Sequence, residues 1–118
     1  MGEFIIVMTT TGSEKEGTAI ASTLVERHQA ACVNLIPSVR SIYRWKDRTW
    51  NEMEHILFIK TTEKMYESVR RTILELHKYE LPEVLSFPLG KGDENTLKWI
   101  RDCLHGKEDT TPNNPHQG

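Results

Sequence analysis

The sequence contains little cysteine. Its two cysteines, Cys32 and Cys103, are too few for a disulfide framework, and they lack the C-x-x-C spacing of a zinc or redox motif. Isolated cysteines of this kind are most often small buried hydrophobic residues. We therefore expect neither a disulfide-stabilised fold nor a zinc site.

Long apolar runs and an excess of one charge are also missing. The longest apolar runs contain about five residues, whereas a membrane-spanning helix needs about 20, and no signal-peptide pattern is present. The 118 residues carry a net charge of −2, which gives a nucleic-acid backbone no electrostatic attraction. We therefore expect a cytoplasmic protein of one domain that binds neither nucleic acid nor a membrane.

Motifs of common catalytic sites are absent too. The sequence has no G-x-S-x-G elbow, no H-E-x-x-H motif and no Walker A loop. The single G-x-G at 90–92 is more often a loop than a phosphate cradle. We expect a protein without enzymatic activity, although an active site assembled from two chains would leave no such motif.

What the sequence does contain is an alternation of apolar strands and amphipathic helices. Ser13 with Glu16 forms a capping box, which predicts the start of a helix, and Asp93 is a good N-cap for a last helix. Pro37 cannot donate to a strand ladder, so it should lie at an edge or a bulge. The predicted strands cover 4–8, 31–45, 54–61 and 83–89, with a turn at 46–49, and the predicted helices follow Ser13, cover 63–77 and follow Asp93.

This order of elements, β α β β α β and a C-terminal helix, predicts an α+β fold. It is the order of the ferredoxin-like, split βαβ arrangement, in which helices cover one face of an antiparallel sheet. The runs FIIVM and ILFI are continuously apolar, as in strands buried on both faces, so something outside the chain must cover the second face. The domain should span residues 1–105, and the polar segment 106–118 should be a disordered tail.

The central hairpin is long for a domain of this size. Residues 31–45, fully extended, would reach roughly 50 Å, whereas the domain diameter should be about 35 Å. Soluble monomers avoid overhanging apolar tips and unpaired strand edges. We therefore predict that several chains associate, with Tyr43, Trp45 and Trp50 at the interface.

The sequence resembles the CutA divalent-cation-tolerance family. The segments ACVNLIP, SIYRW, ILFIKTT, HKYELPEVLSFPL and LKWI occur in the order and spacing of that family, over about residues 4–104. The resemblance implies ferredoxin-like subunits that form a homotrimer, with hairpins extending onto neighbouring subunits and sheets packing face to face. It also implies a role in tolerance of divalent metal ions, mainly copper.

A copper site assigned to some bacterial members of the family is implied only in part. That site uses a cysteine at the end of the first strand and two adjacent histidines, and copper prefers such thiolate and imidazole ligands. Here Thr9 stands at the cysteine position, and Leu76 and His77 stand at the histidine positions. Of that ligand set, His77 alone is present.

The segment 77–83 contains the best candidate binding residues. We interpret His77 and Glu83 as ligands of a divalent ion, copper first, in a pocket between subunits that also includes Lys60, Tyr79 and Trp45. Two alternatives stay open. In the first, these residues have structural roles only; in the second, Lys60 binds a small anion in a trimeric signalling module of the PII type.

Glutamates also occur near the hairpin tip. Glu52 and Glu54 flank Met53, and we expect them to pair across the hairpin with Arg44 and Lys46. Weak binding of a hard cation is the alternative for this carboxylate pair.

Removal of the tail provides a first test. A chain ending at His105 should keep the melting temperature of the full chain, because the segment 106–118 has no apolar side chain to bury. Calorimetry of both chains at one concentration checks this, and a fall of several degrees would mean that the tail is docked.

Overall fold

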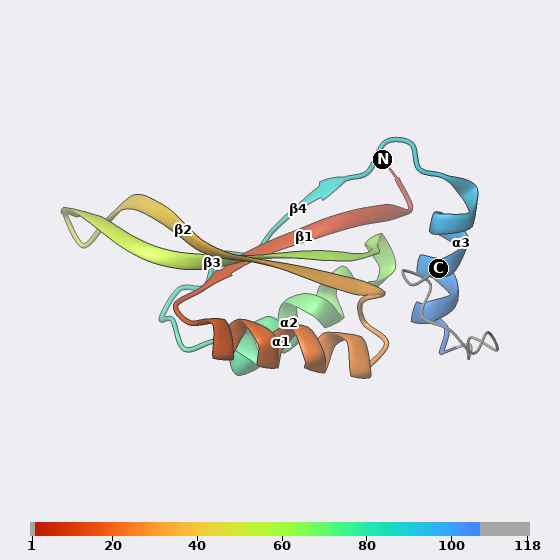
Figure 1. Ribbon diagram of the computed structural model, residues 1–118, viewed down its shortest axis with the longest axis horizontal. Coiled ribbons are helices and arrows are strands. Elements are labelled where there is room, and N and C mark those ends of the chain that lie inside the picture. Colours follow the sequence, from red (N-terminus) through yellow and green to blue (C-terminus); the bar gives the residue numbers. More distant parts are fainter. Residues whose placement is uncertain (1, 107–118) are drawn as a thin grey trace.

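The computed structural model describes residues 2–106, which form an α+β fold with the predicted order of elements. The strands form one open antiparallel sheet in the order β2-β3-β1-β4. Helices α1 and α2 lie together on one face of this sheet, and α3 lies beyond one end of it (Figure 1). The elements are β1 (Phe4–Thr11), α1 (Glu14–Glu26), β2 (Cys32–Trp45), β3 (Arg48–Thr62), a 3-10 turn (Glu63–Met65), α2 (Tyr66–Leu76), β4 (Leu85–Pro88) and α3 (Glu94–Leu104).

Several predicted boundaries were wrong by a few residues. β3 begins at Arg48 rather than at residue 54, because the turn contains only Lys46 and Asp47, with φ angles of 52° and 62°. Two-residue turns of this left-handed kind match the twist of a hairpin. β4 covers 85–88 rather than 83–89, and α2 ends before residue 77. The predicted tail lies, except for Gly106, outside the described residues.

The main core lies between the sheet and the two helices on its face. Odd-numbered residues of β1 and β3 point towards these helices, and Val7, Leu57 and Ile59 are completely buried. They pack against apolar side chains of α1 and α2 that recur at helical spacing, including Ile20, Leu24, Val69 and Ile73. A second, smaller cluster joins α3 to the end of the sheet through Phe4, Ala31 and Ile100.

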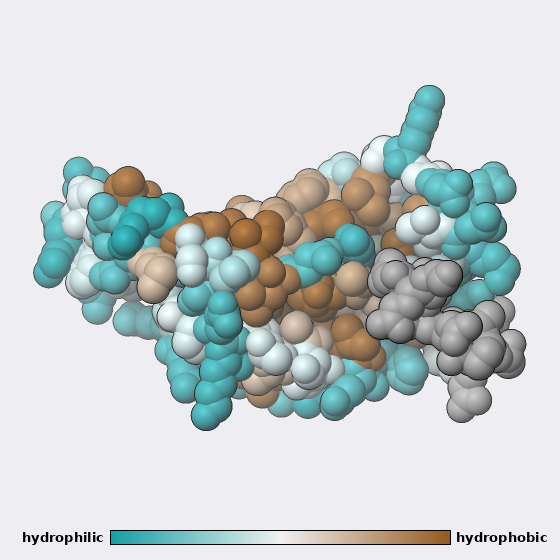
Figure 2. Space-filling model, viewed as in Figure 1, coloured by the Kyte–Doolittle hydropathy of each residue, from teal (hydrophilic) through white to brown (hydrophobic). Residues whose placement is uncertain are grey.

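The opposite face of the sheet is apolar and carries no helix (Figure 1). Even-numbered residues of β1 and β3 and odd-numbered residues of β4 point to this side. Here Met8 of β1 lies between Phe58 of β3 and Leu85 of β4. Leu85 is 52% exposed and Phe87 is 42% exposed. Figure 2 shows hydrophobic side chains gathered over the middle of the molecule, between the polar hairpin tip and α3. We call this uncovered side the open face.

The hairpin of β2 and β3 projects from the domain as predicted (Figure 1). The chain measures 51 Å along its longest axis but 30 and 24 Å along the others. Pro37 lies at a register shift between Ile36 and Val39 on the edge strand β2, which confirms the predicted bulge. There Ser38 has a φ of 60°, and its N–H donates to Nδ1 of His55 at 3.1 Å.

No helix among residues 2–106 is long and apolar enough to cross a membrane.

Substitution of Leu57 tests the main core. Leu57→Ala should lower the free energy of unfolding by about 2–5 kcal/mol, since it leaves a cavity at a completely buried position. Leu74→Ala is the matched control, because Leu74 is 42% exposed on α2, and it should cost less than about 1 kcal/mol. Chemical denaturation at fixed protein concentration measures both, and equal losses would contradict the assigned core.

Candidate functional site

A groove runs along the outer half of the hairpin, where the connection between α2 and β4 passes it. It has a volume of about 950 Å³. It is lined by Thr10 near the end of β1, Gly12 just after that strand, the connecting segment 79–85, and the hairpin residues Ser41, Ile42, Tyr43, Trp45 and 52–54. We call it the acidic groove, because its lining contains four glutamates and no lysine, arginine or histidine.

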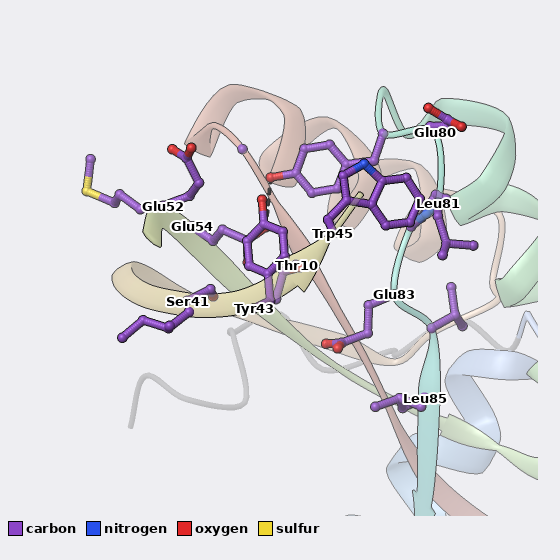
Figure 3. A pocket seen from close by; sticks show the side chains of 16 residues that line it. Thr10, Ser41, Tyr43, Trp45, Glu52, Glu54, Glu80, Leu81, Glu83 and Leu85 are labelled. Atoms are coloured by element: carbon purple, nitrogen blue, oxygen red, sulfur yellow. Dashed lines mark hydrogen bonds between the residues drawn. The ribbon is translucent and has the colours of Figure 1, made fainter. Parts of the chain in front are cut away.

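The most buried of these carboxylates belongs to Glu54. Glu54 is 7% exposed, and its Oε2 accepts a hydrogen bond from the Tyr79 hydroxyl at 2.7 Å (Figure 3). Burial first, and then this bond to a carboxylate, raises the pKa of Tyr79 well above its ordinary value. Tyr79 is therefore a neutral donor that holds the connecting segment against β3.

The predicted pairing of Glu52 and Glu54 with Arg44 and Lys46 was wrong. The register places Glu52 opposite Ser41 and Glu54 opposite Val39. Lys46 instead reaches Glu80, with Nζ 3.7 Å from Oε1. Glu52 and Glu83 make no side-chain hydrogen bond or ion pair within residues 2–106. Among the described residues, the groove thus keeps two exposed carboxylates that no side chain pairs with.

The side chain of His77 is completely buried, and both of its ring nitrogens are hydrogen-bonded. Its Nε2–H donates to the Thr10 carbonyl oxygen at 2.6 Å, and its Nδ1 accepts from the Tyr79 N–H at 3.2 Å. His77 also caps α2, since its N–H donates to the Ile73 carbonyl. The hydrogen bonds therefore leave no ring nitrogen of His77 free to bind a metal ion. Glu83 lines the acidic groove, but His77 does not.

Glu16 is the important residue that sequence reasoning assigned incorrectly. Ser13 caps α1 as predicted, accepting from the Glu16 N–H at 3.1 Å. The Glu16 carboxylate does not return to Ser13, however, but accepts from the N–H groups of Lys78 at 2.8 Å and Gly12 at 3.3 Å. It also lies 3.9 Å from His77 Nδ1. Glu16 therefore ties α1 to the segment that forms one wall of the groove.

The other predicted pocket residues separate into two groups. Trp45 and Tyr79 line the acidic groove, together with Tyr43, which was predicted at the subunit interface. Lys60 does not, because it lies opposite Ile6 on the open face, about 20 Å along β3 from Glu54 at roughly 3.3 Å per residue. Its ammonium has no acidic partner within residues 2–106.

Trp50 stays within the hairpin. Its Nε1–H donates to the Trp45 carbonyl oxygen at 2.9 Å, and the Arg48 guanidinium lies 3.9 Å from the centre of its ring. Its proposed place at a subunit interface stays a prediction.

The positions of the family's copper ligands carry no strong ligand here. Thr9 is completely buried on the helix-facing side of β1, and its hydroxyl has no hydrogen-bond partner among residues 2–106. Leu76 packs against the main core. Within residues 2–106, no three histidine, cysteine, aspartate or glutamate side chains converge to hold a metal ion. A metal site on His77 and Glu83 stays a prediction that the fold of one chain does not favour.

Comparison with known proteins identifies the relatives of this chain. Residues 5–103 match the family described as CutA1 divalent ion tolerance protein. The Divalent-cation tolerance protein CutA of Thermus thermophilus is 36% identical over 97 residues, which are 82% of this chain and 94% of that protein. The chloroplastic protein CutA of Arabidopsis thaliana is 31% identical over 83% of this chain, which spans 54% of that longer relative.

Solved structures agree with this relationship. The divalent cation tolerance protein of Thermus thermophilus has a TM-score of 0.82 at 35% identity, over 84% of this chain and 96% of that one. The periplasmic divalent cation tolerance protein CutA of Archaeoglobus fulgidus has a TM-score of 0.83 at 28% identity, over 86% and 98%. The chain belongs to the CutA1 divalent ion tolerance protein family.

Proposed function

We propose that this protein is a ferredoxin-like homotrimer that binds divalent metal ions weakly, at sites between subunits, and acts in the response to those ions without catalysing a reaction. The observation that carries the binding role is the acidic groove, with four glutamates and no basic side chain in its lining. Family membership supplies the context, because relatives are named for divalent-cation tolerance.

Two features support a trimer. The open face leaves Leu85 and Phe87 exposed, and the hairpin extends beyond the domain, so one chain alone presents apolar surface and unpaired strand edges to water. Packing of the open faces would cover the apolar residues, and the projecting hairpins would then lie on neighbouring subunits.

The chemistry of the groove favours hard cations. Carboxylates suit Mg²⁺, Ca²⁺ and Mn²⁺, whereas tight copper sites use thiolate and imidazole ligands. His77 is already hydrogen-bonded and Thr9 stands at the family's cysteine position. Copper would therefore bind here through Glu83 and neighbouring carboxylates, and weakly. A second subunit would have to complete the ligand set, since one chain gathers no three ligands within residues 2–106.

A binding role fits the groove better than catalysis does. Its buried carboxylate, that of Glu54, is hydrogen-bonded to the Tyr79 hydroxyl, and the raised pKa of Tyr79 keeps its proton on the hydroxyl. A cytoplasmic location is proposed from the sequence alone, and relatives named as chloroplastic and periplasmic show that the family is not confined to one compartment.

Substitution of Trp45 separates assembly from ion binding. Trp45→Ala should shift the dissociation of the trimer to higher protein concentration, because it removes a large apolar side chain from the projecting hairpin. Sedimentation at several concentrations measures the shift, and Leu74→Ala on α2 is the control. An unchanged trimer would remove Trp45 from the interface.

Calorimetric titration tests the ion site. Glu83→Gln should weaken Mn²⁺ binding by roughly tenfold or more, as expected when a charged contact is lost. Glu67→Gln is the matched control, because Glu67 binds Arg70 on α2 and does not line the groove. Mn²⁺ binding that is unchanged in Glu83→Gln would contradict this carboxylate site, and binding of neither Mn²⁺ nor Cu²⁺ would overturn the proposed role.

A further inference from the structure

The Glu54 carboxylate is buried without a positive charge beside it. Glu54 is 7% exposed, and the one hydrogen bond to its carboxylate comes from the neutral Tyr79 hydroxyl. Within residues 2–106 no lysine, arginine or histidine side chain bonds to it. A buried carboxylate is costly unless it is paired with a cation or fully hydrogen-bonded. This group therefore favours a cation that comes from outside the chain.

Aromatic side chains line the same groove. Tyr43, Trp45 and Tyr79 contribute to its walls, and Figure 3 shows the rings of Tyr43 and Trp45 on the groove side together with the carboxyl groups of Glu54 and Glu83. The face of an aromatic ring attracts ammonium and guanidinium groups that lie within about 6 Å of its centre. The chain already uses this contact at the hairpin tip, where Arg48 covers Trp50.

The number of available ligands distinguishes an organic cation from a metal ion. A divalent metal ion needs several oxygen ligands at about 2.0–2.6 Å, and one chain does not gather three such side chains within residues 2–106. An ammonium or guanidinium group needs one carboxylate acceptor and gains further attraction from aromatic faces. Glu54 with its aromatic neighbours meets that smaller requirement within a single subunit.

We propose that the acidic groove binds a small organic cation, an alkyl diamine or a guanidinium compound, with one charged group at Glu54 and the alkyl chain against Tyr43 and Trp45. The exposed, unpaired Glu52 receives the second charge. The volume of about 950 Å³ lies within the range of small-molecule sites, which is about 300–1,000 Å³. The inference shares the acidic groove with the proposed function but uses no metal coordination, so either one can fail alone.

Titration of the full chain with cadaverine tests the inference, with pentanediol of the same length as the uncharged control. Cadaverine should bind and pentanediol should not. Glu54→Gln preserves the shape of the side chain and removes its charge, and it should weaken cadaverine binding by about tenfold or more. Glu67→Gln, outside the groove, should leave binding unchanged. Equal binding of the two compounds, or no binding of cadaverine, would overturn the proposal.

Substitutions of Tyr79 separate the contribution of the ring from that of the hydroxyl, and they remain informative if Glu54→Gln fails to fold. Tyr79→Phe keeps the ring and frees the Glu54 carboxylate, so cadaverine should bind as tightly or more tightly. Tyr79→Leu removes the ring as well, and affinity should fall by roughly three- to fivefold. Equal affinities of the two variants would contradict a contribution of the Tyr79 ring to the binding site.

A parallel titration with Mn²⁺ distinguishes failure of this inference from failure of the proposed function. Cadaverine binding that depends on Glu54, with no binding of Mn²⁺, supports the inference and removes the metal site. Mn²⁺ binding that depends on Glu83, with no cadaverine binding, supports the proposed metal site and overturns the inference. If cadaverine affinity falls in Glu83→Gln but not in Glu54→Gln, the cation is held only by surface charge and the inference is wrong.

Discussion

The uncovered apolar face of the sheet is the constraint on which the rest of this structure depends. Two helices can cover one side of a four-stranded sheet, and α1 and α2 both lie on the same side. The other side keeps large apolar side chains such as Leu85 and Phe87 exposed, which is unfavourable in water at about 25 cal/mol per Å² of apolar surface. The continuous apolar strands and the projecting hairpin both become consistent with stable solution behaviour once further copies of the chain cover this face.

The acidic groove depends on a second constraint, the buried polar contacts that fix the segment between α2 and β4. Glu16 on α1 accepts two backbone N–H groups, one of them from Lys78, and His77 donates to the Thr10 carbonyl. These contacts bring Tyr79 to Glu54 on the hairpin. Because buried polar groups are costly when unpaired, this set of bonds fixes the wall of the groove, on which the exposed carboxylates of Glu52 and Glu83 also lie.

Much of the fold could be predicted from local sequence signals, whereas the site could be predicted only in part, through Trp45, Tyr79 and Glu83. Ser13 and Asp93 cap helices where the sequence placed them, and Pro37 lies at a bulge, because each of these effects acts over a few residues. His77 was interpreted as a metal ligand because the sequence does not reveal its hydrogen-bond partner. That partner, the Thr10 carbonyl, is 67 residues away in the chain. Likewise, the capping-box pattern identified Glu16 but not its bond to Lys78, and strand register separates Lys60 from the groove. Such long-range pairings leave no local pattern.

The mass of the full chain in solution tests the central claim most directly. Light scattering at micromolar concentration should give three times the chain mass of 13.7 kDa, because the proposed trimer covers the open face and supports the hairpin. A mass equal to that of one chain, with the protein folded and soluble, would contradict the account, since the open face would then be stable in contact with water.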